Sequence, residues 1–284
     1  MSAARPLPLT EKMVSTLLPP RPRDSHKGMF GTVAVIGGAP GMIGAALLAG
    51  RAAFKLGAGA VHVGLLADKM PLVDMRMPEL MLHPAALVLA QCRADVWVVG
   101  CGLGTSLPAQ KLLYDALHSE AALVLDADAL NLIAARPDLR SLLHARRGAT
   151  VCTPHPGEAA RLLGCSTEEV QQDRPRAALS LAQRLHADIV LKGAGSLIAS
   201  RNGQLHLNQT GNPGMSSAGM GDVLAGMVAA LMAQGLTAHD ALLLGVYLHG
   251  AAADALEKQH ATIGMSATEV TEWARWLLNQ MIRA

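Results

Sequence analysis

The chain has 284 residues, of which 51% are hydrophobic, 16% charged and only 2% aromatic, and its net charge is +2 at pH 7. This length fits one large domain or two small ones, and the core must be built mainly from Ala, Leu, Val and Met, which favours close packing of small-residue helices on a sheet. The dispersed charges and the scarcity of aromatic side chains argue against a nucleic-acid or membrane-surface function.

The first 27 residues are rich in proline and charge, and they lack the apolar stretch of a signal peptide. We expect residues 1–27 to form an N-terminal extension and residues 28–284 to form one domain, because no later change of composition marks a linker. The uncharged segment 28–50 is interrupted by glycines and Pro40, so we expect no membrane span there.

The four cysteines are Cys92, Cys101, Cys152 and Cys165. None forms a CxxC pair and no histidine clusters beside them. This pattern favours reduced, mostly buried thiols in a cytoplasmic protein.

Short β-branched runs alternate with longer helical patterns along the chain. Strands are predicted at 32–36, 60–65, 95–99, 123–126, 150–152 and 188–192, followed by a hairpin of 196–200 and 204–207 across Asn202-Gly203. Helices are predicted at 42–56, 217–234, 238–258 and 266–281, and capping boxes pair Ser166 with Glu169 and Ser266 with Glu269. The alternation predicts an α/β fold with a mainly parallel central sheet and helices on both faces.

Glycine-containing segments follow many of these strands. They span 37–44, 100–104, 154–157, 193–195 and 211–221. Ligands of open α/β sheets bind beyond the carboxyl ends of the strands, so we expect these segments to surround one crevice. Each could also simply end a strand, and the first matches neither GxGxxG nor a P-loop.

The segment 208–222 is the most informative one, because a glycine-rich loop delivers Asp222 to the start of an apolar helix. A helix N-terminus offers unpaired N–H groups and a partial positive charge, which suit a phosphate. Asp222 could cap the helix, or it could accept a proton from a hydroxyl beside a bound phosphate. The preceding loop favours the catalytic interpretation.

Two further segments carry side chains that suit ligand binding. Lys192 ends a buried strand, and its amine could hold a nucleotide phosphate with the loop N–H groups and the Ser196 hydroxyl. A lysine that reaches back to solvent is the alternative. His155 stands between two prolines that fix its backbone, so it could bind a ligand or remain solvated, and His249 is expected to be an ordinary half-buried histidine.

Asp126 and Asp128 follow another predicted strand. If that strand continues, both carboxylates lie on one face and could orient a metal or a sugar. More often, acids in such positions cap the next helix.

Taken in order, the segments GGAPGMIGAALLAGRAAFKLGAG, GLG, DADALN, TPHPGEAARLL, LKGAGSLIA, GNPGM and AGMGDVLAGM resemble the ADP/ATP-dependent NAD(P)H-hydrate dehydratase family of the ribokinase-like superfamily. The resemblance covers nearly the whole chain from about Lys27. It implies a ribokinase-like fold and a repair enzyme that converts the S epimer of NADHX or NADPHX to NADH or NADPH. Its co-substrate would be ADP or ATP, with Mg²⁺.

The resemblance also implies roles for individual residues. Asp222 would act on the substrate hydroxyl, and the hydrated dinucleotide would contact Gly44, Ala45, Gly104 and His155. The adenine nucleotide would be held by Lys192, Gly193, Ala194, Gly195, Ser196 and Gly221. No protein ligand of Mg²⁺ is assigned.

A homotetramer is implied as well. Many relatives carry a fused epimerase domain for which this chain has no room, so a separate epimerase is expected to act on the R epimer. The chain departs from common family residues at four positions: Met220 replaces Ser or Thr, Ala218 replaces Gly, Cys101 replaces Pro and Ser196 replaces Thr. A hydroxyl contact to phosphate from position 220 is therefore absent.

Two other functions stay open. A ribokinase-like kinase of a vitamin precursor or sugar would share Asp222 but would leave a stable phosphorylated product. A non-catalytic nucleotide sensor would bind without turnover. The segment TPHPGE and the first glycine turn favour the dehydratase.

Overall fold

A ten-stranded sheet forms the centre of the molecule in the computed structural model, which describes residues 5–17, 21–260 and 262–283. The strands, in sheet order, are β1 (Leu7–Pro8), β10 (Leu205–Asn208), β9 (Ser196–Ala199), β8 (Asp188–Leu191), β7 (Thr150–Cys152), β6 (Ala122–Leu125), β5 (Val96–Val99), β2 (Thr32–Gly37), β3 (Ala60–Leu65) and β4 (Met81–Pro84). Neighbouring strands are parallel except where β9 meets β8 and β10. The predicted mainly parallel sheet and the hairpin are confirmed.

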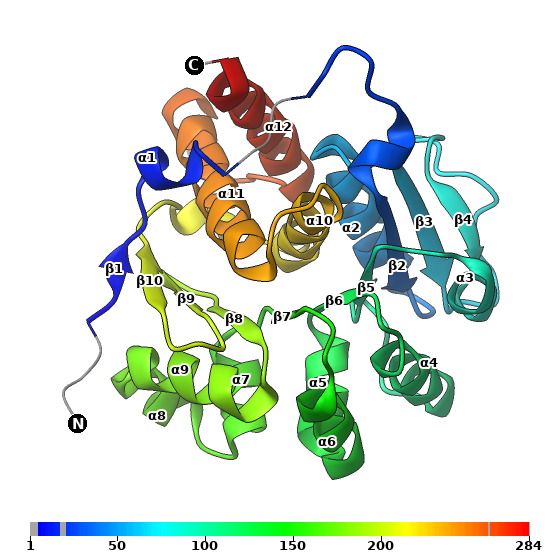
Figure 1. The fold of residues 1–284 in the computed structure, drawn as a ribbon, viewed down its shortest axis with the longest axis horizontal. Helices are drawn as coiled ribbons and strands as arrows, with labels where there is room; N and C mark the ends of the chain where they lie inside the picture. The colour runs from blue at the N-terminus through cyan, green and yellow to red at the C-terminus, as the bar shows by residue number, and fades with distance from the viewer. Residues whose placement is uncertain (1–4, 18–20, 261, 284) are drawn as a thin grey trace.

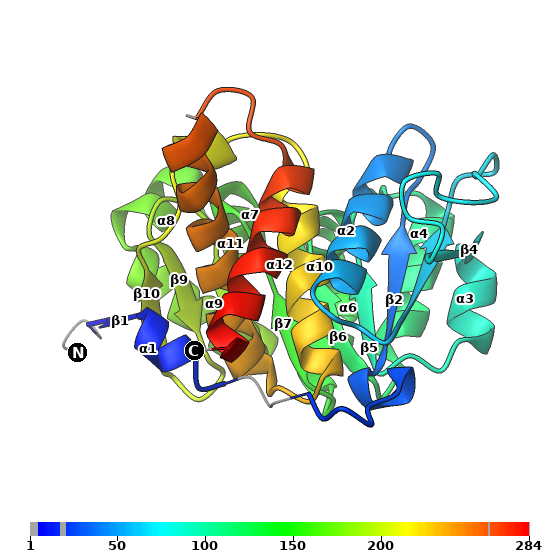
Figure 2. The same ribbon diagram turned by 90° about the horizontal axis from the view of Figure 1, so that it is seen from above.

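Helices cover both faces of this sheet (Figures 1 and 2). One face carries α2 (Ile43–Lys55), α10 (Met220–Ala233), α11 (Ala238–His260) and α12 (Ala267–Arg283). The other carries α3 (Ala85–Gln91), α4 (Leu107–Leu117), α5 (Asp128–Ala135), α6 (Pro137–Ala145), α7 (Pro156–Leu163), α8 (Thr167–Gln172) and α9 (Arg174–Leu185). Three short helices, α1 (Glu11–Val14), η1 (Lys27–Phe30) and η2 (Pro213–Met215), complete the described chain.

The side chains of β2 alternate between the two faces of the sheet and so contribute to both hydrophobic clusters. Val33 and Val35 belong to the hydrophobic cluster on the α10 face, whereas Ala34 and Ile36 belong to the cluster on the opposite face. All four are fully buried. A strand covered on both faces must be apolar at every position, which explains the unbroken hydrophobic run in the sequence.

Small residues let α2 and α10 approach each other closely, as the composition predicted. A Cβ built on Gly226 of α10 would lie 2.1 Å from the backbone oxygen of Ala49 in α2. No side chain can occupy that space, so Gly226 fixes the spacing of the two helices. The position of the start of α10 over the sheet depends on this contact.

Several segments differ from their predicted limits. β1 pairs with β10, and Leu9 and Val14 are buried, so this part of the N-terminal extension packs on the domain. The helix predicted from residue 217 begins at Met220, because Gly219 has a φ of 89° and belongs to the loop. β4 was missed because its sequence, Met-Leu-His-Pro, contains no β-branched residue.

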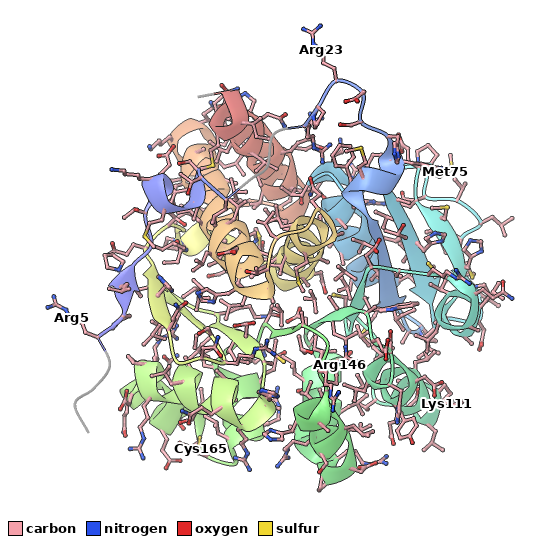
Figure 3. All side chains as sticks on the ribbon, viewed as in Figure 1. Arg5, Arg23, Met75, Lys111, Arg146 and Cys165 are labelled. Atoms are coloured by element: carbon pink, nitrogen blue, oxygen red, sulfur yellow. The ribbon has the colours of Figure 1, made fainter. Side chains whose placement is uncertain are left out.

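Two sequence expectations concern the state of the cysteines and the presence of a membrane span. The four cysteines are free thiols, of which Cys101 and Cys152 are buried, and Cys165 lies in the helical layer below the sheet (Figure 3). Within the described ranges, no helix has both the length and the apolar character needed to cross a bilayer.

Candidate functional site

The glycine-containing segments meet at the carboxyl edge of the sheet, as expected for strands that run in the same direction. The turn after β2 contacts the turn after β5, where Gly38 N–H donates to the Cys101 oxygen at 3.1 Å and Ala39 N–H donates to Gly102 at 2.7 Å. The segments after β7 and β8 are joined by the N–H of Lys192, which donates to the Pro154 oxygen at 2.9 Å. These bonds place the candidate residues around one edge.

Asp222 lies in the first turn of α10 and does not cap that helix. The N-cap is Gly219, and no side-chain cap bond is formed there. The Asp222 carboxylate instead approaches the thiol of Cys101 and the carboxylate of Asp126, with one ligand atom of each lying within 4.8 Å of the others. The capping alternative is therefore wrong, and the acid faces the carboxyl edge of the sheet.

Asp126 forms a buried ion pair with Lys192. The Lys192 amine donates to Asp126 Oδ1 at 2.8 Å, and the hydroxyl of Thr153 donates to the same oxygen at 2.6 Å. Asp126 is 2% exposed, and the Lys192 side chain is 21% exposed. Lys192 thus turns inward to a carboxylate, and the solvent-reaching alternative is wrong.

Asp126 and Asp128 do not share a strand face. β6 ends at Leu125, and Ala127 between the two acids has a φ of 48°, which breaks the alternation. Asp128 accepts the backbone N–H of Gly104 at 2.8 Å and so holds the glycine turn after β5. Neither the shared-face interpretation nor a side-chain cap of α5 is found.

The backbone of Gly221 lies against the ion pair. A Cβ built there would be 3.1 Å from the Lys192 amine and 3.3 Å from Asp126 Oδ2. A side chain at this position would crowd both charges, so glycine lets the first turn of α10 lie directly beside them. Of the predicted nucleotide-binding residues, Gly221 and Lys192 are brought together.

The rest of the predicted nucleotide loop lies next to Lys192 on the surface. Gly193 and Ala194 are exposed, and the hydroxyl of Ser196 donates to the Gly193 oxygen at 3.0 Å. Arg174 donates to the oxygens of Leu191 and Gly195 at 3.2 and 3.1 Å and so pins the loop. No sequence signal had indicated Arg174.

His155 serves as the N-cap of α7. Its Nδ1 accepts the N–H groups of Gly157 and Glu158 at 3.0 and 3.4 Å, and the Glu158 carboxylate accepts the His155 N–H at 2.8 Å. Burial, followed by the charges of Lys192 and Arg161, lowers the pKa of His155, so the ring is neutral near pH 7. Half of the side chain is exposed, which leaves it accessible to a ligand.

Gly44 and Ala45, the other predicted substrate contacts, begin α2 beside the turn that contains Gly104. Gly44 is exposed with open space around it, and the Cβ of Ala45 lies 3.1 Å from a Cβ built on Gly102. They belong to the same edge as Asp222.

Burial and neighbouring charges together shift the pKa values of the acids and bases at this edge. Burial, then the nearby Asp126, raises the pKa of Asp222 to about 6. Burial alone would lower the pKa of Lys192, but Asp126 and Glu158 outweigh it and raise that pKa. Glu158 lies 4.0 Å from the Lys192 amine.

His249 is not the ordinary half-buried histidine predicted. It is 7% exposed, and its Nε2 has no hydrogen-bond partner among the described residues. Burial, then the charge of Lys192, lowers its pKa to about 4, so it remains neutral beside the ion pair.

Cys101, Asp126 and Asp222 are the group of possible metal ligands found in the described part of the chain. The set does not suit Mg²⁺, which prefers oxygen ligands and disfavours a thiol. Lys192 also already neutralises one oxygen of Asp126. We therefore assign no protein cage for Mg²⁺ to these residues.

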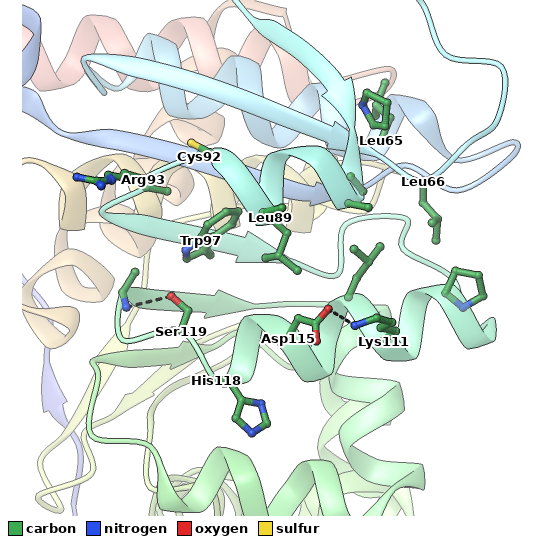
Figure 4. A pocket seen from close by; sticks show the side chains of 18 of the residues that line it. Leu65, Leu66, Leu89, Cys92, Arg93, Trp97, Lys111, Asp115, His118 and Ser119 are labelled. Atoms are coloured by element: carbon green, nitrogen blue, oxygen red, sulfur yellow. Dashed lines mark hydrogen bonds and ion pairs between the residues drawn. The ribbon is translucent and has the colours of Figure 1, made fainter.

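A large cavity lies elsewhere. It measures about 1230 Å³ and opens between α3 and α4, beneath Trp97 and Leu89 (Figure 4). It shares no residue with the predicted catalytic, substrate or nucleotide sets. Its lining is mostly apolar, and its Lys111–Asp115 ion pair is exposed, unlike the buried charges at the carboxyl edge. Buried charge therefore identifies the candidate site better than cavity volume does.

Known proteins show strong similarity to this chain. The model of a family described as NAD(P)H-hydrate dehydratase matches residues 33–275. The chain belongs to this family. It is 42% identical to the ADP-dependent (S)-NAD(P)H-hydrate dehydratase of Neisseria meningitidis serogroup B over 93% of the chain and 90% of that relative. Bifunctional NAD(P)H-hydrate repair enzymes also match, and the chain spans about half of their length, 54% and 51% in two cases.

Solved structures of the family have the same fold. The ADP/ATP-dependent NAD(P)H-hydrate dehydratase of Bacillus subtilis, co-crystallised with ATP/Mg²⁺, superposes with a TM-score of 0.86 at 30% identity, covering 98% of this chain and all of that one. A ribokinase-like superfamily protein of Enterococcus faecalis V583 has a TM-score of 0.85 at 28% identity, with 97% and 96% covered. The predicted ribokinase-like α/β class is confirmed.

Proposed function

We propose that this protein dehydrates the S epimer of NADHX or NADPHX to NADH or NADPH at the expense of ADP or ATP. The observation that carries the proposal is the position of Asp222, in the first turn of α10 beside the Lys192–Asp126 pair, in a chain of the NAD(P)H-hydrate dehydratase family. A hydroxyl bound at this point would have a carboxylate on one side and a positively charged helix start on the other.

The chemistry needs a better leaving group than hydroxide. The Asp222 carboxylate takes the proton of the ring hydroxyl, whose oxygen forms a bond to the terminal phosphorus of the nucleotide as the bond to the leaving phosphate oxygen breaks. The new phosphate then leaves with its electron pair, aided by the adjacent ring nitrogen, while the neighbouring ring carbon loses a proton to solvent. The ring double bond returns, and the products are NAD(P)H, inorganic phosphate and a shortened nucleotide.

The remaining assignments are proposals supported by position. Gly44, Ala45, Gly104 and His155 would contact the hydrated dinucleotide, and Lys192 to Ser196 with Gly221 would hold the adenine nucleotide. Mg²⁺ would arrive with the nucleotide phosphates and neutralise their charge. We also propose a cytoplasmic homotetramer and a separate epimerase for the R epimer.

The test is an assay of the purified protein with NADHX or NADPHX plus ADP or ATP. Return of dihydronicotinamide absorbance together with release of inorganic phosphate is the expected result. A stable phosphorylated product would favour the small-molecule kinase instead. Nucleotide binding without any turnover would favour the sensor.

A further inference from the structure

Asp126 contacts Lys192 and lies within 4.8 Å of Asp222, whereas the sequence suggested for it only a metal- or sugar-orienting role or a helix cap. Its Oδ1 accepts from Thr153 and Lys192, while its Oδ2 points to the start of α10 at Gly221. Asp126, Thr153 and Lys192 directly follow the adjacent strands β6, β7 and β8. Three neighbouring strand ends therefore build one hydrogen-bonded unit at the edge of the sheet.

This unit determines where the Lys192 amine lies. Lysine has a long, flexible side chain, and an unpaired lysine at a strand end would extend into solvent. Here the amine is held within 3.1 Å of a Cβ built on Gly221, beside the first turn of a 14-residue helix. Its positive charge adds to the partial charge of the helix start.

We propose that Asp126 is a positioning residue that holds the Lys192 ammonium at the start of α10, where it faces the phosphoryl group in transfer, and that places a second negative charge within 4.8 Å of the Asp222 carboxylate. This inference rests on the proposed function. Asp126 itself touches neither substrate nor phosphoryl group. It acts through Lys192 by a hydrogen bond and through Asp222 by its charge.

Asp126 and Lys192 should shift the pKa of Asp222 in opposite directions. The groups facing Asp222 are Asp126 and Asp128, whose charges oppose its ionisation, and Lys192 and Cys101, which favour it by charge and by a hydrogen bond. Replacing Asp126 by a neutral residue should make Asp222 a stronger acid, whereas replacing Lys192 should make it a weaker acid. A purely structural role would not produce this opposition.

The experiment compares Asp126→Asn and Lys192→Gln with the wild-type enzyme across pH. For Asp126→Asn we expect kcat to fall about 10²–10³-fold, because the transition-state cation is misplaced. The acidic limb of kcat/KM should move to lower pH by about one unit in Asp126→Asn and to higher pH by a similar amount in Lys192→Gln. Nucleotide affinity of Asp126→Asn should fall by much less than kcat, because the loop after β8 and the start of α10 still hold the nucleotide when the Lys192 amine is displaced.

Asp74→Asn provides a matched control, because Asp74 is also buried and paired with a cation, Arg51, and its hydrogen bonds go to Arg51 and Arg76 rather than to a residue of the candidate site. It should keep the wild-type kcat and pH profile. Thr153→Val, which keeps both charges, should lower kcat about tenfold and provides a second test if Asp126→Asn does not fold.

Each result is decisive for a different claim. A wild-type protein that cannot dehydrate NADHX or NADPHX refutes the proposed function. An active wild type with normal kcat in Asp126→Asn or, if that variant does not fold, in Thr153→Val refutes the positioning role alone. A reduced kcat with pH limbs that move in the same direction, or not at all, also refutes it.

Discussion

Two buried carboxylates of this chain, Asp74 and Asp126, pair with cations at 2.7 and 2.8 Å but use their oxygens differently. Asp74 forms two bonds to Arg51, and its Oδ1 also accepts the N–H of Arg76. Asp126 receives both of its bonds at Oδ1, and its other oxygen points to the start of α10. In the Asp74 pair both carboxylate oxygens accept hydrogen bonds, which stabilises the fold. In the Asp126 pair one oxygen is directed at a neighbouring functional group, so this pair can also influence chemistry.

The strongest test of this difference is removal of Asp222, the proposed base beside the Asp126–Lys192 pair. In Asp222→Asn, kcat should fall about 10²–10⁴-fold, because the amide cannot accept the hydroxyl proton. Nucleotide affinity, measured by calorimetry, should be largely kept. A variant that repaired NADHX at the normal rate would show that another group is the base.

The wild-type pH profile belongs to the same test. In the proposed mechanism Asp222 must be ionised, and burial and Asp126 raise its pKa to about 6. We therefore expect kcat/KM to be constant above this pH and to decline as pH falls through about 6. A decline centred near the ordinary pKa of an aspartate, about 4, would contradict the raised value.

The sequence located the edge of the sheet that carries the site, because glycine segments after parallel strands must meet there. It also predicted that Asp222 lies at a helix start, since a glycine loop is followed there by an apolar helix, and the structure places Asp222 in the first turn of α10. It did not identify the partners. Lys192 contacts Asp126, which lies 66 positions earlier in the chain, and no local pattern indicates which acid a distant lysine will meet.

The missed features share a physical cause. β4 has no β-branched residue, and its pairing with β3 comes from the tertiary fold rather than from propensity. Arg174 reaches the loop after β8 from the start of α9, so its role depends on how helix and strand pack. Thr153 and Glu158 lay within a segment already singled out, and only their partners were unknown.

At the Asp74–Arg51 pair we expect a smaller effect, on stability rather than on catalysis. Asp74→Asn should lower the free energy of unfolding by about 1.5–3 kcal/mol at pH 7, because hydrogen bonds to a charged group are lost, while kcat stays unchanged. Burial alone would raise the pKa of Asp74, but its bonds to Arg51 and Arg76 lower it overall. The stabilisation should therefore be present above about pH 4 and lost as pH falls below it, which urea denaturation at several pH values would measure.

The smallest expected effect separates two roles of His155. His155→Ala removes the cap of α7 and should lower the free energy of unfolding by about 1 kcal/mol, whereas His155→Asn should retain most of it, because asparagine is a good N-cap. If the imidazole also contacts the hydrated dinucleotide, both variants should raise KM for NADHX.

The pH dependence of the cap has a definite sign. The folded-state pKa of His155 is lowered, so protonation of Nδ1 opposes the cap, and the wild-type advantage over His155→Ala should shrink as pH falls below about 6.5. Equal KM values in wild type, His155→Ala and His155→Asn would restrict His155 to capping. A raised KM in both variants, with stability lost only in the alanine variant, would show that one side chain stabilises a helix with Nδ1 and binds substrate with the rest of its ring.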